Sequence, residues 1–212
     1  MSTASSNLPI YEPQRDAPRR HAEEQRLVLH GISYTRYVAV RELLEEQGLR
    51  VAYREGVMEI MSPSVLHESF KKKIARLLEL FALERGIDLF AYGAATFRSE
   101  PKERGLEPDE CYFVRQDRDP LLRPYPDLAI EVIVSSGALD KLDIYDGLGV
   151  REVWIFEGTG HAIFVHRVEG GYAQAERSSV LPELEVEMLA TYARYPDINV
   201  ALRKYRDALR SP

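Results

Sequence analysis

The order of elements along this chain predicts a mixed α/β (α+β) fold, in which a mixed β-sheet is flanked by helices. Three observations support this class. Residues 65–86 carry apolar side chains at the 3.6-residue spacing of a helix, residues 49–61 and 152–168 read as two strand pairs, and residues 126–134 form a nearly continuous apolar run. Helices and strands do not alternate regularly, so a doubly wound parallel sheet is not predicted.

Each element has a local reason to form. Thr35 is expected to cap a helix that runs to Gly48, and Glu55-Gly56 is expected to turn the hairpin between residues 49–54 and 57–61. Ser62-Pro63-Ser64 breaks the second strand and opens the 65–86 helix, which Gly86 ends. The remaining expected elements are strands at 87–97, 109–115, 126–134, 152–157 and 161–168, a helix at 138–147, a strand or helix start at 184–189, and a terminal helix through Ile198, Leu202 and Tyr205.

Length and composition predict one domain with an N-terminal extension. The chain has 212 residues, of which 45% are hydrophobic and 29% are charged, as in ordinary globular proteins. Residues 1–25 are polar and rich in Pro, Arg and Glu without an apolar period, so we expect a flexible tail there and a single domain over residues 26–212.

Cysteine count and charge exclude several classes of site. Cys111 is the one cysteine, which excludes an intrachain disulfide framework and any zinc site built from several cysteines. We therefore expect a reducing, cytoplasmic compartment, and neither a secretory signal nor a membrane-spanning run is visible. The net charge of -6 argues against broad, nonspecific coating of nucleic acid but leaves room for a local basic groove.

The strand at residues 126–134 carries acids inside an otherwise apolar run. Alternate residues of a strand share a face, so Asp127, Ala129, Glu131 and Ile133 are expected to point one way and Leu128, Ile130, Val132 and Val134 the other. A buried acid is costly unless a cation meets it. Both a divalent metal ion and an ion pair satisfy that requirement.

A metal site needs a second acid from a neighbouring strand. Asp127 and Glu131 are four residues apart, about 13 Å in a strand, and cannot both bind one ion. Asp109, which opens the preceding strand, is the best partner for Glu131. Oxygen ligands of this kind favour Mg²⁺ or Mn²⁺, so the pair Asp109 and Glu131 is the predicted metal site, unless the two acids serve a structural ion pair.

The helix after the acidic strand supplies a cation. Lys141 can reach back toward Glu131, and Tyr145 lies four residues later on the same helical face. A metal, two carboxylates and a lysine suit phosphodiester hydrolysis, because the lysine can stabilise the charge that develops on the phosphate. Lys141 could instead be only an ion-pair partner or a surface lysine, and Tyr145 only a packing residue. Asp127 could support the metal-binding acids or fix the entrance of its strand.

These segments together resemble the Uma-type restriction endonuclease family of the PD-(D/E)xK nuclease superfamily. The resemblance is carried by Pro108-Asp109, by Pro126–Ile133, by Lys141-Leu142-Asp143-Ile144-Tyr145, by Gly149–Trp154, and upstream by Gly56–Pro63 and His67, and it covers roughly residues 30–170. It implies a restriction-endonuclease-like core and divalent-metal-dependent cleavage of DNA. Asp109 corresponds to the motif aspartate and Glu131 to the motif acid.

Two positions depart from the superfamily pattern. The usual lysine two residues after the motif acid is Ile133 here, and Lys141 matches the position where Uma-type relatives carry a migrated lysine. The loop after the acidic strand reads Val134-Ser135-Ser136 and lacks the usual proline. His67 matches the histidine of the family's first core helix, where it would contact the metal water or a phosphate, or else pack as a hydrogen-bonded core histidine.

Two functions follow from this reading. The first is a Mg²⁺- or Mn²⁺-dependent endodeoxyribonuclease, a hydrolase with DNA as partner and a homodimer as a reasonable assembly, because cleavage of both strands is simplest with two symmetric sites. The second is a catalytically inactive protein that kept the nuclease fold and serves as an interaction or nucleic-acid-binding module. The displaced lysine and the acidic net charge favour the second to some degree.

Overall fold

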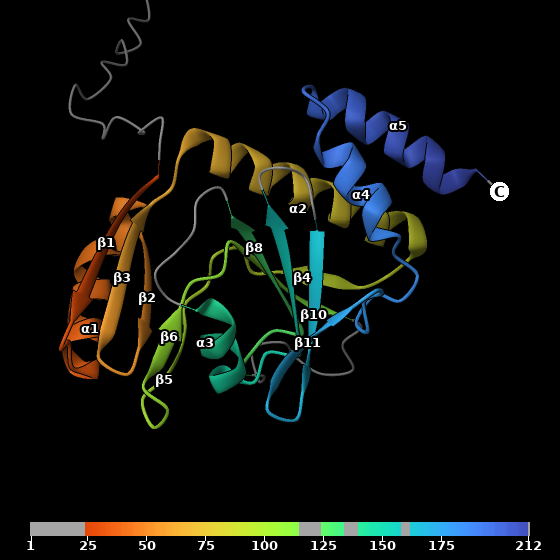
Figure 1. Cartoon of the computed structure of the whole chain (residues 1–212). Helices are drawn as coiled ribbons and strands as arrows, with labels where there is room; N and C mark the ends of the chain where they lie inside the picture. The colour runs from red at the N-terminus through yellow and green to blue at the C-terminus, as the bar shows by residue number, and fades with distance from the viewer. Residues whose placement is uncertain (1–23, 115–123, 134–139, 158–161, 212) are drawn as a thin grey trace, which may run out of the picture.

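Two β-sheets and five α-helices make up the described part of the chain, residues 24–114, 124–133, 140–157 and 162–211 of the computed structural model (Figure 1). This is the α+β class that the sequence predicts. The predicted tail lies outside the described residues except for Glu24 and Gln25, which the structure places at the start of the fold.

The smaller sheet is antiparallel throughout. Its five strands lie in the order β1 (Gln25–His30), β3 (Val57–Ser62), β2 (Arg50–Arg54), β6 (Arg104–Leu106) and β5 (Phe97–Ser99). The helix α1 (Tyr34–Leu44) and the short 3₁₀ turn η1 (Glu45–Gln47) precede β2. Ser33 caps α1 by accepting the N–H of Arg36, and Thr35 is already helical. The prediction of Thr35 as the cap was therefore wrong by two residues, because Ser33 is the hydroxyl residue that still has an extended backbone.

The larger sheet is mixed and carries the candidate site. Its six strands lie in the order β11 (Gly171–Ala175), β10 (Ala162–Val168), β9 (Glu152–Glu157), β8 (Leu128–Ile133), β7 (Glu110–Val114) and β4 (Leu89–Ala91). Only β8 and β9 pair in parallel among these neighbours in the described chain. A parallel pair needs a crossover, and α3 (Lys141–Leu148) lies in this one.

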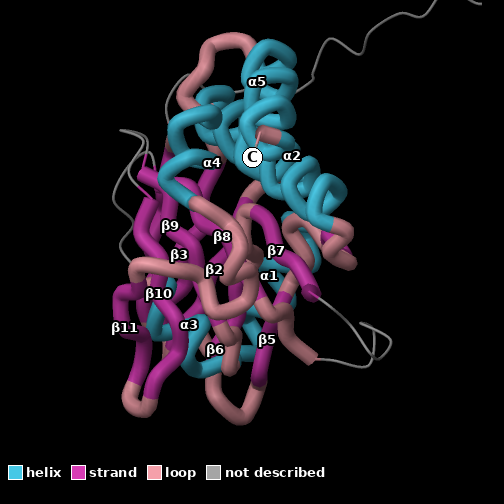
Figure 2. The backbone as a smooth tube through the Cα atoms, turned by 90° about the vertical axis from the view of Figure 1, so that its right-hand side faces the viewer, coloured by secondary structure: helices cyan, strands magenta, loops and turns pink. Residues whose placement is uncertain are grey.

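Helices cover both faces of the larger sheet. The helix α2 (Val65–Arg85) crosses one face, and α4 (Val186–Ala193) and α5 (Ile198–Arg210) pack on it, as Figures 1 and 2 show from two directions. On the other face, α3 lies between the two sheets. None of the helices in the described ranges is long and apolar enough to cross a membrane.

The acidic strand β8 divides its side chains between these two layers. Leu128, Ile130 and Val132 belong to the core under α2, whereas Ala129 belongs to the core around α3. Glu131 also faces α3, where it meets Lys141 and Tyr145. The predicted alternation is thus confirmed over residues 128–132, and Val134 lies outside the described residues.

The structure adds elements that the sequence did not predict. The strands divide into two sheets, β1 and β11 are present, and residues 97–106 contain the short hairpin β5–β6. The expected strand at 87–97 is reduced to Leu89–Ala91, and the ambiguous segment at 184–189 begins a helix. The short strands gain their stability from pairing across a sheet, which a local pattern cannot reveal.

Candidate active site

Asp109 and Glu131 lie opposite each other at one end of the β7–β8 ladder. Glu110 pairs with Ile130 in antiparallel register, so Asp109, one residue earlier, faces Glu131. Residues directly opposite in such a ladder have Cα atoms about 4.5–5.5 Å apart. Both side chains are buried, with 1% of Asp109 and 3% of Glu131 exposed. The predicted meeting of two acids from neighbouring strands is therefore present in the backbone geometry.

Asp109 is held by one backbone group and one side chain. Its Oδ2 accepts the N–H of Val132 at 2.8 Å, and its Oδ1 lies 2.8 Å from Nε2 of His67 at the start of α2. Burial alone would raise the pKa of Asp109, but the hydrogen bond from His67 and the charge of Lys141 outweigh it and lower the pKa below its usual value. Asp109 is therefore a carboxylate at neutral pH.

Glu131 is bonded to two residues of α3. Nζ of Lys141 donates to Oε2 at 2.5 Å, and the hydroxyl of Tyr145 donates to Oε1. Lys141 is the first residue of α3, where Asp140 caps the helix, and Tyr145 follows one turn later, so both side chains reach the same carboxylate. The structure thus joins the predicted residues Glu131, Lys141 and Tyr145 in one cluster.

Burial and charge act in opposite directions on the residues around Glu131. Burial raises the pKa of Glu131, and Lys141 offsets this only in part because the charge of Asp109 raises it further. Burial would lower the pKa of Lys141, but the charges of Glu131 and Asp109 raise it above its usual value. Burial and the neighbouring Glu131 raise the pKa of Tyr145. Lys141 is therefore a cation and Tyr145 a neutral donor at neutral pH.

His67 connects Asp109 to a second carboxylate that the sequence did not identify. Its Nδ1 lies 2.7 Å from Oε1 of Glu24, and 1% of the His67 side chain is exposed. Ionised carboxylates only accept hydrogen bonds, so a ring that meets one at each nitrogen donates twice and is an imidazolium. Burial alone would lower the pKa of His67, but the hydrogen bonds of Asp109 and Glu24 outweigh it and raise the pKa.

The series of hydrogen-bonded charged side chains continues beyond Glu24. Arg26 donates from Nη2 to Oε2 of Glu24 at 3.2 Å and from Nη1 to Oε1 of Glu59 at 2.6 Å. The side chains of Glu24 and Glu59 are each only 2% exposed. Glu24 and Arg26 were missed because they stand at the edge of a polar segment, and their role depends on the pairing of β1 with β3, which no local signal announces.

The two carboxylates of this site suit Mg²⁺ or Mn²⁺, which can bind with only a few ligands from the protein. Within the described ranges, no group of three or more His, Cys, Asp or Glu side chains is placed to hold a metal ion. Mg²⁺ commonly uses one or two carboxylates and completes its shell with waters and substrate phosphates. Asp109 and Glu131 supply two carboxylates, and each oxygen has a lone pair beyond the hydrogen bond described above.

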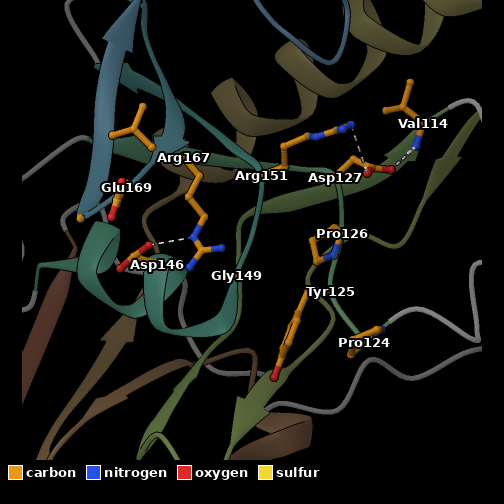
Figure 3. A pocket seen from close by; sticks show the side chains of 12 residues that line it. Val114, Pro124, Tyr125, Pro126, Asp127, Asp146, Gly149, Arg151, Arg167 and Glu169 are labelled. Atoms are coloured by element: carbon orange, nitrogen blue, oxygen red, sulfur yellow. Dashed lines mark hydrogen bonds and ion pairs between the residues drawn. The ribbon is translucent and has the colours of Figure 1, made fainter.

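Asp127 lies at the other end of β8 and is not part of this cluster. Figure 3 shows its carboxylate between the N–H of Val114, which donates to Oδ2 at 3.0 Å, and Arg151, whose Nη1 is 4.0 Å from Oδ1. Asp127, Val114 and Arg151 also line a cavity of about 950 Å³. Arg167 lines it as well and donates a hydrogen bond to Asp146 at 2.8 Å. The hydrogen bond from Val114 joins Asp127 to β7 just before β8 begins.

A model of a known protein family matches most of this chain. The model of the family Uma2, described as "Putative restriction endonuclease", matches residues 37–195. A search of curated proteins finds no match. The matched range contains Asp109, Glu131, Lys141 and His67 and covers most of the chain, whereas Glu24 and Arg26 precede it. The chain belongs to the Uma2 family of restriction endonuclease-like proteins.

Proposed function

We propose that this protein is a divalent-metal-dependent endonuclease that hydrolyses phosphodiester bonds of DNA. The observation that carries the proposal is the buried pair Asp109 and Glu131, placed opposite each other with the ammonium of Lys141 on Glu131. A buried pair of acids at a strand end, with a lysine beside one of them, is costly to maintain for stability alone. Membership of a restriction endonuclease-like family supports the same chemistry.

Each residue has a defined task in this reaction. Asp109 and Glu131 would hold Mg²⁺ or Mn²⁺, which polarises a phosphate and makes a bound water more acidic. Lys141 places a positive charge beside the acids, where it can stabilise the negative charge that grows on the phosphate as the water oxygen bonds to phosphorus. The phosphorus–oxygen bond to the leaving group then breaks, the attacking water gives up one proton to solvent, and the leaving oxygen takes one proton from solvent.

Tyr145 and His67 hold the two acids in place. The hydroxyl of Tyr145 orients Glu131 from α3, and the His67 ring orients Asp109 from α2. Both contacts are to carboxylate oxygens, so both residues act through the acids and not by touching the substrate. Asp127, at the far end of β8, is assigned to the strand entrance.

Plasmid cleavage tests this function directly. The purified protein is incubated with supercoiled plasmid and Mn²⁺ or Mg²⁺, and the same assay is run with Glu131→Ala, Asp109→Asn and the exposed control Glu187→Gln. We expect nicking or linearisation by the wild type and the control, and a loss of at least about 100-fold in both acid variants. Cleavage that survives Glu131→Ala would reject the site.

One observation favours a different function. Each of the four oxygens of Asp109 and Glu131 already has a hydrogen-bond partner within the chain, so the two acids are satisfied without a metal. A non-catalytic module that kept the nuclease fold would look the same. Absence of cleavage together with absence of Mn²⁺ binding in calorimetry would favour that module.

Assembly and location remain predictions of the same proposal. A homodimer would bring two active sites to the two strands of a DNA duplex. Light scattering of the purified protein measures its oligomeric state. A cytoplasmic location follows from the single cysteine and stays an expectation.

A further inference from the structure

Glu24 stands out among buried acids because it belongs to the first described residues and still reaches the candidate site. Its Oε1 lies 2.7 Å from Nδ1 of His67, whose other nitrogen lies 2.8 Å from Asp109. Only 2% of the Glu24 side chain is exposed. A carboxylate this deeply buried needs compensation, and His67 and Arg26 provide it.

We propose that Glu24 is a positioning residue of the active site, which fixes the His67 ring and through it the carboxylate of Asp109. The proposal rests on the nuclease function above. A histidine ring that is bonded through one nitrogen can still swing about that contact. A second bond at the opposite nitrogen fixes the plane of the ring, and here the second bond comes from Glu24.

Arg26 makes this arrangement rigid. It bridges Glu24 on one side and Glu59 on the other, at 3.2 and 2.6 Å. Glu59 belongs to β3, the partner of β1, so the bridge ties the Glu24 carboxylate to the sheet. The pairing of β1 with β3 therefore supplies an outer layer of the site from residues that precede the part matched by the family model.

The size of the effect follows from comparable sites. Residues that orient a metal ligand typically change metal affinity or activity by about 10- to 100-fold when they are removed. Glu24→Ala removes the acceptor of the His67 ring. Glu24→Gln keeps a side chain of the same length, whose carbonyl oxygen can accept the N–H of His67, while its NH2 group no longer accepts from Arg26. A positioning role therefore predicts rescue by glutamine.

The full-length protein carrying Glu24→Ala, Glu24→Gln or the control Glu187→Gln tests this in cleavage kinetics and Mn²⁺ calorimetry. We expect Glu24→Ala to lower kcat or Mn²⁺ affinity by about 10- to 100-fold, Glu24→Gln to stay within about threefold, and Glu24→Ala to add nothing in a His67→Ala background. Equal loss in both Glu24 variants, or an undiminished effect without His67, would overturn the proposal.

A spectroscopic measurement separates failure of this proposal from failure of the nuclease function. Nitrogen-15 spectra of the His67 ring report both nitrogens without any metal or substrate. We expect Glu24→Ala to change the Nδ1 resonance and Glu24→Gln to keep it close to wild type. If the wild type neither cleaves DNA nor binds Mn²⁺, the nuclease function fails, and an Nδ1 resonance that Glu24→Ala leaves unchanged shows that Glu24 does not position the ring.

Discussion

Nζ of Lys141 lies 2.5 Å from Oε2 of Glu131, although Glu131 belongs to the strand β8 and Lys141 to α3, the helix of the crossover that follows this strand. In the superfamily pattern the lysine follows the acid by two residues on the same strand, and here that position is Ile133. The helix α3 brings an ammonium to the motif acid by another route. This contact is the reason for proposing Lys141 in the role of that lysine.

Lys141→Met should abolish most of the cleavage. Methionine keeps an unbranched stem but removes the charge, and loss of one electrostatic stabiliser costs about 100- to 1000-fold in kcat. Removal of one partner from a fully buried ion pair costs about 3–5 kcal/mol, and we expect less here because 24% of the Lys141 side chain is exposed. Plasmid cleavage and denaturant unfolding measure the two effects. Unchanged kcat would leave Lys141 as an ion-pair partner only.

Ile133→Lys should restore part of the activity of Lys141→Met. Ile133 is two residues after Glu131, so the strand alternation puts both side chains on one face, and 38% of Ile133 is exposed and can accept a charged head. We expect the double variant to cleave at least about tenfold faster than Lys141→Met alone, since the ammonium returns to the same acid. Ile133→Leu in the same background is the matched control and should restore nothing.

Divalent metal should stabilise the wild type against heat. A ligand that binds only the folded state at 100 times its Kd adds about 2.7 kcal/mol to the free energy of unfolding, which for a chain of this length raises Tm by about 5–10 °C. Calorimetric scans with and without Mn²⁺ measure the shift. Asp109→Asn and Glu131→Gln should remove it. A shift of the same size in both variants would place the metal elsewhere.

Asp127→Ala should cost stability and spare cleavage. The substitution removes the acceptor of the buried N–H of Val114, and an unsatisfied buried group costs about 1–3 kcal/mol. Asp127 is at the opposite end of β8 from Glu131, so kcat per folded molecule should stay within about threefold. The opposite result, lost cleavage at unchanged stability, would assign Asp127 to the metal-binding acids.

Cys111 should be unreactive in the folded protein. Burial raises the pKa of its thiol to about 12, so almost no thiolate forms at pH 8 and a thiol reagent should label the protein only after unfolding. The unfolded chain loses this proton near pH 9, so between about pH 9 and 12 the folded state holds more protons, and stability falls as pH rises. Cys111→Ala should flatten that slope in denaturant unfolding. Rapid native labelling at pH 8 would contradict the burial.

The sequence revealed those parts of the fold whose signals are local. The α2 helix begins at Val65 after its Ser64 cap and ends at Gly86, and β9 spans Glu152–Glu157, as the residue pattern predicts. The face shared by Ala129 and Glu131 follows from strand alternation alone. Chain order also pointed to Asp109 as the acid opposite Glu131, because strands that follow one another in the sequence often pair.

The rest of the site depends on contacts between distant segments. Glu24 meets His67 across 43 positions, and Arg26 meets Glu59 across 33, so neither pair leaves a periodic signal. The polar composition of residues 1–25 pointed to a tail, since a strand of six residues gains most of its stability from its neighbour. Partner choice between strands is set by the whole fold.

Delivery of the ammonium from α3 changes which mutations the candidate site can tolerate. A lysine on the acidic strand keeps its distance to the acid whatever happens beyond the strand. Lys141 instead is the first residue of α3, so its position beside Glu131 depends on where that helix begins. Loss of the Asp140 cap would weaken the first turn of α3, which carries Lys141, whereas the strand pairing of both sheets does not depend on that cap. Substitutions at the start of α3 are thus a route by which natural variants could lose the contact between Lys141 and Glu131 and keep their architecture.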